Sequence, residues 1–171
     1  LQRRGSRVTR AMTPLRFDVV FSPSAEATRA IERGLHEFNL ACLGEDGVYD
    51  YDEVVVLGRA AGDQVVGGVY GELGWDWLYV KTMWVAQEHR DKGIGTRLLE
   101  QIEKAALSEG FEHAHLETTD FQALEFYLEN GYEIFGQLEG KPAGHTLYYL
   151  KKDLSTAPDP GESSGAVPSG R

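Results

Sequence analysis

Two glycines and two basic residues lie close together in the sequence, between a strand-like segment and a predicted helix. The stretch Arg90-Asp-Lys-Gly93-Ile-Gly95 follows the β-rich run Trp77–Val85 and opens the amphipathic segment Gly93–Ser108. The first turn of a helix has free backbone N–H groups and the positive end of the helix dipole. Glycine leaves room for a phosphate to approach these groups. The sequence therefore predicts an anion-binding turn, to which Arg90 and Lys92 would add positive charge.

This turn differs from two common nucleotide-binding loops. It lacks the GxxxxGK[ST] pattern of a Walker A loop and the GxGxxG spacing of a Rossmann dinucleotide site. Two glycines are also compatible with a plain strand–helix turn, in which glycine serves only tight packing. A second glycine-rich run, Gly67–Gly71, is more typical of a strand with close backbone contacts than of a phosphate loop.

Alternating strand and helix signals surround the turn. We expect strands at Leu15–Phe21, Glu53–Ala60, Gln64–Glu72, Trp77–Val85, His113–Thr118, Tyr132–Leu138 and His145–Lys151. We expect helices at Ala25–Leu43, with Ser24 as its cap, at Gly93–Ser108 and at Gln122–Asn130. This order predicts an α/β (α+β) protein in which helices flank a mixed sheet.

The turn and its surroundings resemble the GNAT superfamily of acetyl-CoA-dependent N-acetyltransferases, especially its bacterial small-molecule members. Arg90–Gly95 fits the R/Q-x-x-G-x-G/A motif of that superfamily, and a strand ending in Trp84-Val85 precedes it. The segment Phe126-Tyr127-Leu-Glu-Asn-Gly131-Tyr132 follows at the expected distance. The resemblance covers residues 15–152 in element order and is strongest over 77–132. It implies a GNAT-like, mostly antiparallel sheet that is splayed at the acetyl-CoA site.

The resemblance also implies where acetyl-CoA, the co-substrate, would bind. Main-chain groups at the end of the splayed strand would pair with the pantetheine arm as though it were another strand. Amides of the following turn would hold the pyrophosphate. The residues assigned to coenzyme binding are Met83, Trp84, Val85, Arg90, Asp91, Lys92, Gly93, Ile94, Gly95, Thr96 and Phe126. The matching tyrosine of the family faces the thioester sulfur, so Tyr127 is the candidate general acid that protonates the departing thiolate.

The group that receives the proton of the amine stays open among several candidates. Some family members place a glutamate on the strand before the turn, where this chain has Tyr79. The remaining candidates are Glu72, Glu117, His36 and His145, of which Glu72 and His145 join Tyr127 in the predicted catalytic set. The predicted acceptor site comprises His36, Asn39, Trp75, Tyr79 and Glu117. Alternating His113, His115 and Glu117 form a pattern that can bind metal, but no second ligand cluster accompanies it, and we expect no metal.

The charge of the chain favours a cationic acceptor. Residues 12–154 hold 25 acidic and 12 basic residues, a formal net charge of −13. Such a body repels phosphate backbones and attracts amines. We therefore expect acetyl transfer to a primary amine of a small, cationic molecule. The single cysteine, Cys42, lies far from the motif in sequence, so direct attack in a ternary complex is expected rather than an acyl-cysteine route.

Composition divides the chain into three parts. Residues 1–11, with four arginines and no acid, are predicted to be a disordered basic arm, and residues 155–171, rich in Pro, Gly and Ser, a disordered tail. Residues 12–154 would form one N-acetyltransferase domain. The sequence shows no apolar run near the roughly 20 residues of a membrane span and no secretory h-region, which predicts a cytoplasmic protein without a membrane partner. The acidic body predicts that there is no nucleic-acid partner either. A homodimer is left open.

Other functions compete with this prediction. The same fold could acetylate protein N-termini or lysines, which requires a peptide groove. It could also be a non-catalytic acyl-CoA-binding module, because an intact phosphate turn suits both. A toxin that acts on aminoacyl-tRNA is a third alternative, which the arginine-rich arm favours and the acidic body opposes.

Overall fold

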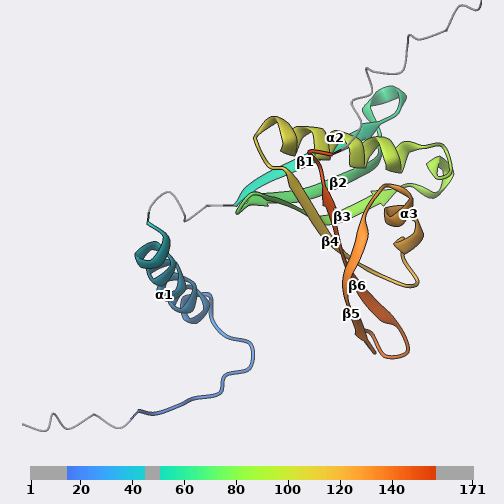
Figure 1. Cartoon of the computed structure of the whole chain (residues 1–171). Coiled ribbons are helices and arrows are strands. Elements are labelled where there is room, and N and C mark those ends of the chain that lie inside the picture. Colours follow the sequence, from blue (N-terminus) through green and yellow to red (C-terminus); the bar gives the residue numbers. More distant parts are fainter. Residues whose placement is uncertain (1–14, 45–50, 157–171) are drawn as a thin grey trace, which may run out of the picture. The chain divides into compact units, whose positions relative to one another are not determined.

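A computed structural model describes residues 15–44 and 51–156, and the chain divides into two compact units between Val48 and Tyr49 (Figure 1). The first unit contains helix α1 (Ala25–Leu43), which confirms the helix predicted there. Ser24 caps it, since the Ser24 hydroxyl oxygen accepts a hydrogen bond from the Ala27 backbone N–H at 3.3 Å.

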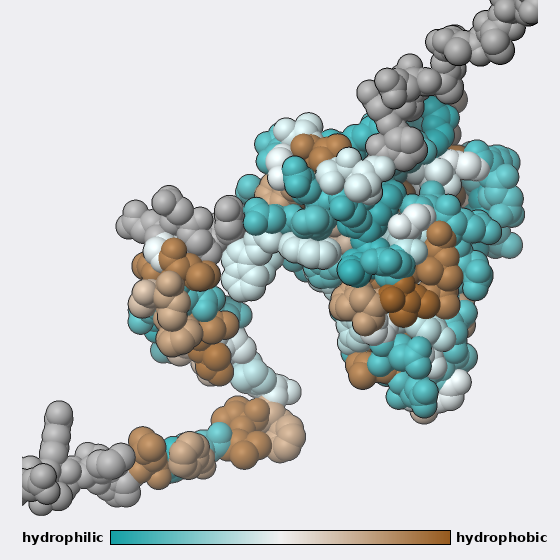
Figure 2. Space-filling model, viewed as in Figure 1, coloured by the Kyte–Doolittle hydropathy of each residue, from teal (hydrophilic) through white to brown (hydrophobic). Residues whose placement is uncertain are grey.

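The strand predicted at Leu15–Phe21 was wrong. These residues form no strand, and large apolar side chains among them, such as Phe17 and Phe21, are exposed. Figure 2 shows mostly hydrophobic residues along this segment. An apolar–polar alternation becomes a strand only where a neighbouring strand supplies hydrogen bonds. No strand of the described residues pairs with this segment.

The second unit is built on one sheet. Its strands are β1 (Asp52–Arg59), β2 (Val65–Gly74), β3 (Trp77–Val85), β4 (His113–Thr119), β5 (Glu133–Glu139) and β6 (Thr146–Asp153). They lie in the order β1-β2-β3-β4-β6-β5. Only β3 and β4 among these neighbours run parallel. Helices α2 (Ile94–Ser108) and α3 (Leu124–Glu129) accompany the sheet, with short 3-10 helices at Ala61–Asp63 and Gln87–His89. The predicted mixed, mostly antiparallel sheet flanked by helices is thus confirmed, although α3 is shorter than expected.

Helix α2 packs against the middle of the sheet. Its residues Leu98, Ile102 and Ala106 are buried on one stripe. The buried sheet residues of the same core are Val69, Leu73, Leu78, Val80, Ala114, Leu116 and Leu150. A partly buried ion pair between Lys152 Nζ and Glu103 Oε2, 2.7 Å apart, also joins α2 to β6. These contacts fix the helix, and with it the turn that precedes it.

Two glycines of β2 let its neighbours come close. A Cβ at Gly71 would lie 2.8 Å from the Tyr79 carbonyl oxygen and 3.2 Å from Ile102 Cδ1. A Cβ at Gly67 would lie 3.0 Å from the Trp84 carbonyl oxygen. The prediction that Gly67–Gly71 is a strand with close backbone contacts is therefore confirmed.

Some predictions lie beyond what the structure describes. The basic arm at 1–11 and residues 157–171 of the tail are outside the described residues. That residues 12–154 form one domain stays a prediction. Among the described residues, no helix is both long enough and apolar enough to cross a membrane.

Candidate active site

Strands β3 and β4 part halfway along their length. They pair only from Trp77 to Val80 on β3, opposite His113 to Leu116 on β4. Beyond that point, Lys81–Val85 have no strand partner on the β4 side within the described part of the chain. On the other side, the register between β2 and β3 shifts at a bulge that leaves Lys81 without a partner. The predicted splay of the sheet is confirmed.

A cleft of about 1190 Å³ opens at this gap. It is lined by the end of β3, the turn before α2, the first residues of α2, the end of β4 and most of α3. The predicted site residues among its lining are Met83, Trp84, Val85, Arg90, Asp91, Gly93, Ile94, Gly95, Thr96, Glu117, Phe126 and Tyr127. Lys92 is not among them. Its ammonium group donates to the Glu88 carbonyl oxygen at 2.7 Å.

The turn before α2 ends in a helix start without a side-chain cap. Gly93 takes the left-handed conformation at φ 72°, ψ 7°, and no side chain bonds to the first turn of α2. The N–H groups of Ile94, Gly95 and Thr96 are consequently open to a ligand in the cleft. The Arg90 Nε–H donates to the Val85 carbonyl oxygen at 3.0 Å, which fastens the turn to β3.

Gly95 is the point where three elements meet. A Cβ there would lie 3.2 Å from Phe126 Cε2 on α3 and 3.4 Å from Met83 Cε on β3. The absence of a side chain at Gly95 thus lets the aromatic residue of α3 lie against the start of α2.

Tyr127 of α3 faces the cleft from a buried position. Its side chain is 8% exposed and makes edge contacts with the rings of Phe126 and Tyr132. Within residues 15–44 and 51–156, the Tyr127 hydroxyl has no hydrogen-bond partner, although buried tyrosines usually have one. Burial raises the pKa of Tyr127, so the hydroxyl stays protonated at neutral pH.

The connection from β4 to α3 holds Tyr127 in place. The Ala123 N–H donates to Thr118 Oγ1 at 3.4 Å, and the Thr119 N–H donates to Gln122 Oε1 at 3.0 Å. Asn130 Nδ2 donates to the Phe126 carbonyl oxygen at 2.7 Å. Sequence reasoning missed these polar residues, because each looks like an ordinary loop or cap residue until the neighbouring strand is placed.

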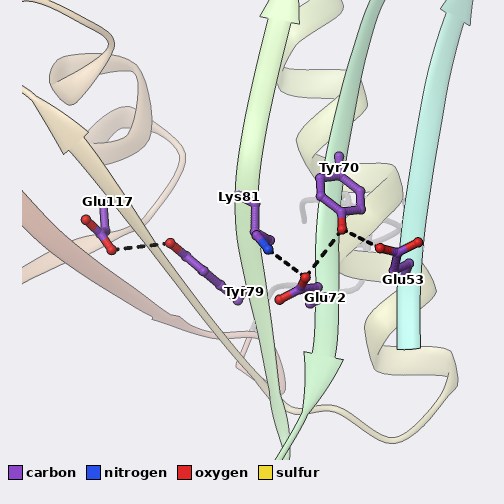
Figure 3. Close-up of polar contacts among 6 residues, drawn as sticks. All are labelled: Glu53, Tyr70, Glu72, Tyr79, Lys81 and Glu117. Carbon is purple, nitrogen blue, oxygen red and sulfur yellow. Dashed lines mark hydrogen bonds and ion pairs between the residues drawn. The ribbon is translucent and has the colours of Figure 1, made fainter. Parts of the chain in front are cut away.

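Glu72 belongs to a polar network on β1, β2 and β3 (Figure 3). Lys81 Nζ lies 2.6 Å from Glu72 Oε1. The Tyr70 hydroxyl donates to Glu53 Oε1 at 2.7 Å and also lies 3.3 Å from Glu72 Oε1. The hydrogen bond to Glu53, followed by desolvation and nearby negative charge, raises the pKa of Tyr70 to about 12. Glu72 therefore already has a cationic partner, and it does not line the cleft.

His145 lies beside the cleft lining rather than in it. Its Nδ1 is 2.9 Å from Asp120 Oδ1, and its ring packs edge-on against Phe121. Asp120 and Phe121 do line the cleft, which sequence reasoning missed.

The predicted acceptor residues are spread over both units. Trp75 lies in the β2–β3 turn, outside the cleft lining, and is half-exposed. Tyr79 contacts Glu117, which lines the cleft. His36 and Asn39 lie on α1, in the first unit.

His113 and His115 pack on aromatic rings. The His115 ring stacks on Tyr79 with centroids 4.5 Å apart, and the His113 ring lies 4.9 Å from that of Trp77. Burial lowers the pKa of His115, against a smaller opposite effect of Glu117. The described residues include no group of three or more His, Cys, Asp or Glu side chains that could hold a metal ion.

Comparisons with known proteins agree on one family. The profile of the acetyltransferase (GNAT) family matches residues 25–132. Blasticidin-S acetyltransferase of Streptomyces morookaense is 37% identical over 92 residues, which are 53% of this chain and 68% of that protein. The crystal structure of an acetyltransferase from Bacillus cereus superposes with a TM-score of 0.73 at 26% identity, over 80% of this chain and 97% of that one. An aminoglycoside 6'-N-acetyltransferase complexed with coenzyme A shares the fold at 18% identity and a TM-score of 0.56, over 82% of this chain and all of that one. The chain therefore belongs to the acetyltransferase (GNAT) family and is an acetyltransferase.

Proposed function

We propose that the protein transfers the acetyl group of acetyl-CoA to a primary amine of a small, cationic molecule. The observation that carries this proposal is the cleft itself, in which an uncapped helix start, an unpaired strand edge and a buried tyrosine meet. The uncapped helix start can bind a phosphate group, and the unpaired strand edge can bind an extended pantetheine arm. The buried tyrosine can protonate a thioester sulfur.

The coenzyme would bind along β3 and the start of α2. The unpaired backbone of Lys81–Val85 offers hydrogen bonds to the amides of the pantetheine arm, as an added strand would. The open N–H groups after Gly93 suit the pyrophosphate. An aminoglycoside 6'-N-acetyltransferase of the same fold is complexed with coenzyme A, which supports coenzyme A as a ligand of this fold.

Tyr127 would protonate the sulfur that leaves. Tyr127 lines the cleft, and its hydroxyl has no partner among the described residues. The hydroxyl stays protonated because burial raises the pKa of Tyr127. As the C–S bond breaks, the phenolic proton passes to the sulfur, and solvent returns a proton to the phenolate. We expect the amine to attack the thioester directly, because the sole cysteine, Cys42, lies far from the phosphate-binding turn in sequence.

The charge of the cleft favours a cationic acceptor. Its lining contains four acidic side chains, Asp91, Glu117, Asp120 and Glu125, against the two cations Lys81 and Arg90. The similarity to a blasticidin-S acetyltransferase further supports a small molecule as acceptor.

Thiol release from acetyl-CoA across a panel of acceptors tests the function. We expect primary amines that carry a second positive charge to react at least about tenfold faster than neutral primary amines, because the cleft attracts cations. Peptides with free N-termini should react poorly. Fastest transfer to peptides would instead identify a protein acetyltransferase, and coenzyme binding without transfer to any amine would identify a binding module.

Replacing Gly93 by Asp tests the phosphate site. A Cβ at Gly93 meets nothing within 4 Å. The positive φ there strains most side chains, but Asp adopts it more readily than most residues, so the fold should survive. The carboxylate would repel a pyrophosphate. We expect the acetyl-CoA affinity measured by calorimetry to fall at least about 100-fold, a loss of about 2.7 kcal/mol. Gly110→Asp is the matched control, because Gly110 also has a positive φ and open space but follows the other end of α2. Equal affinities for the two variants would refute the assignment.

Replacing Tyr127 by Phe tests the general acid. The variant keeps the ring packing and loses the proton, so kcat should fall about 10²-fold while the acetyl-CoA affinity changes little. Tyr132→Phe removes a buried, unpartnered hydroxyl from the same aromatic cluster outside the cleft and serves as control. A Tyr127→Phe variant that transfers acetyl at the wild-type rate, with chemistry rate-limiting, would leave Tyr127 with a packing role only.

A further inference from the structure

Glu117 lies where β3 and β4 separate. Leu116 is the last β4 residue that pairs with β3, and Glu117 follows it directly. Leu116 and Thr118 are buried, so the alternation along the strand turns Glu117 to the other, exposed face of the sheet. Glu117 nevertheless lines the same cleft as Tyr127. A carboxylate thus stands at the inner end of the gap in which the thioester would lie.

Tyr79 holds one oxygen of this carboxylate (Figure 3). The Tyr79 hydroxyl donates to Glu117 Oε1 at 3.2 Å, and the Tyr79 ring is fixed by its stack on His115. Burial, followed by the charge of Glu117, raises the pKa of Tyr79, so its hydroxyl remains a donor. In the described part of the chain, Glu117 Oε2 has no hydrogen-bond partner, and Glu117 is among the residues that line the cleft.

The other carboxylates and imidazoles near the cleft are less free. Glu72 is ion-paired with Lys81 and lies outside the cleft lining. Asp120 uses one oxygen for His145 and the other for the Thr146 N–H at 3.2 Å. His145 itself is not part of the lining.

Two further acids of the lining sit elsewhere in the cleft. Asp91 belongs to the turn that would hold the pyrophosphate. Glu125 is exposed and lies about 200° around α3 from the inward-facing Tyr127. Glu117 is therefore the carboxylate best placed to meet a nucleophile opposite Tyr127.

We propose that Glu117 is the catalytic residue that takes the proton from the attacking amine, and that Tyr79 is a positioning residue that orients it. This inference rests on the proposed acetyl transfer. The nitrogen lone pair of the neutral amine forms a bond to the thioester carbon, and the C–S bond breaks with its electron pair going to sulfur. One nitrogen proton passes to Glu117 Oε2, while the sulfur receives the Tyr127 proton. Glu117 then releases its proton to solvent and Tyr127 regains one, so that one proton in total moves from nitrogen to sulfur.

Single-turnover transfer by Glu117→Gln tests the role of Glu117. The amide keeps the size of the side chain but cannot accept the proton, so the rate with a primary amine at saturating acetyl-CoA should fall about 10²-fold. Acetyl-CoA affinity should stay within about threefold of the wild type. Glu139→Gln, on exposed β5 and outside the cleft, should react at the wild-type rate. Formate added to Glu117→Ala should restore part of the rate in proportion to its concentration, which no purely structural role would produce.

A double-mutant comparison tests Tyr79. Tyr79→Phe should lower kcat about tenfold with little change in the KM for either substrate. In the Glu117→Gln background, Tyr79→Phe should have no further effect on kcat, because its action passes through Glu117.

Each contrary result has a distinct meaning. If the wild type transfers acetyl but Glu117→Gln keeps its rate, or if formate does not rescue Glu117→Ala, the role of Glu117 is refuted. If Glu72→Gln or His145→Gln shows the large loss in place of Glu117→Gln, the base is one of those residues. If the wild type transfers acetyl to no amine, both the proposed function and this inference fall.

Discussion

The separation of β3 from β4 after Val80 is the constraint on which the site depends. A strand in the middle of a sheet normally has both edges paired, because unpaired backbone N–H and C=O groups are costly when they are removed from water. Here the bulge at Lys81 turns the end of β3 away, and a cleft takes the place of further pairing. The unpaired backbone groups of β3 can therefore bind any ligand that offers them hydrogen-bond partners.

The core keeps this gap open. Buried residues of α2, such as Ile102, belong to the same core as Leu78 and Leu116, and these strand residues lie in the part of β3 and β4 that is still paired. The same helix begins directly after Gly93, at the far end of the gap. One packed helix therefore fixes both the width of the cleft and the position of its phosphate-binding end. Two hydrogen bonds between the end of β4 and the residues just before α3 then help to place Tyr127 against this frame.

Local sequence signals predicted the parts of the site that lie close together in the chain. The glycines at 93 and 95 and the flanking strand and helix mark the turn, because each residue there acts through its own backbone. The strand at Leu15–Phe21 failed for the opposite reason, since a strand depends on a neighbour that alternation cannot reveal. The partners of the candidate bases were hidden in the same way. That Glu72 is held by Lys81, and Glu117 by Tyr79, follows only from the register of β2, β3 and β4.

Amide hydrogen exchange with and without coenzyme A tests the central claim most directly, because it reads the unpaired strand edge itself. If the pantetheine arm pairs with β3, amides within Lys81–Val85 should exchange at least about tenfold more slowly in the complex, as expected for newly formed hydrogen bonds. Amides of β5, outside the cleft lining, should not change. Protection at the start of α2 without any protection in Lys81–Val85 would contradict the account, because the coenzyme would then bind without using the gap.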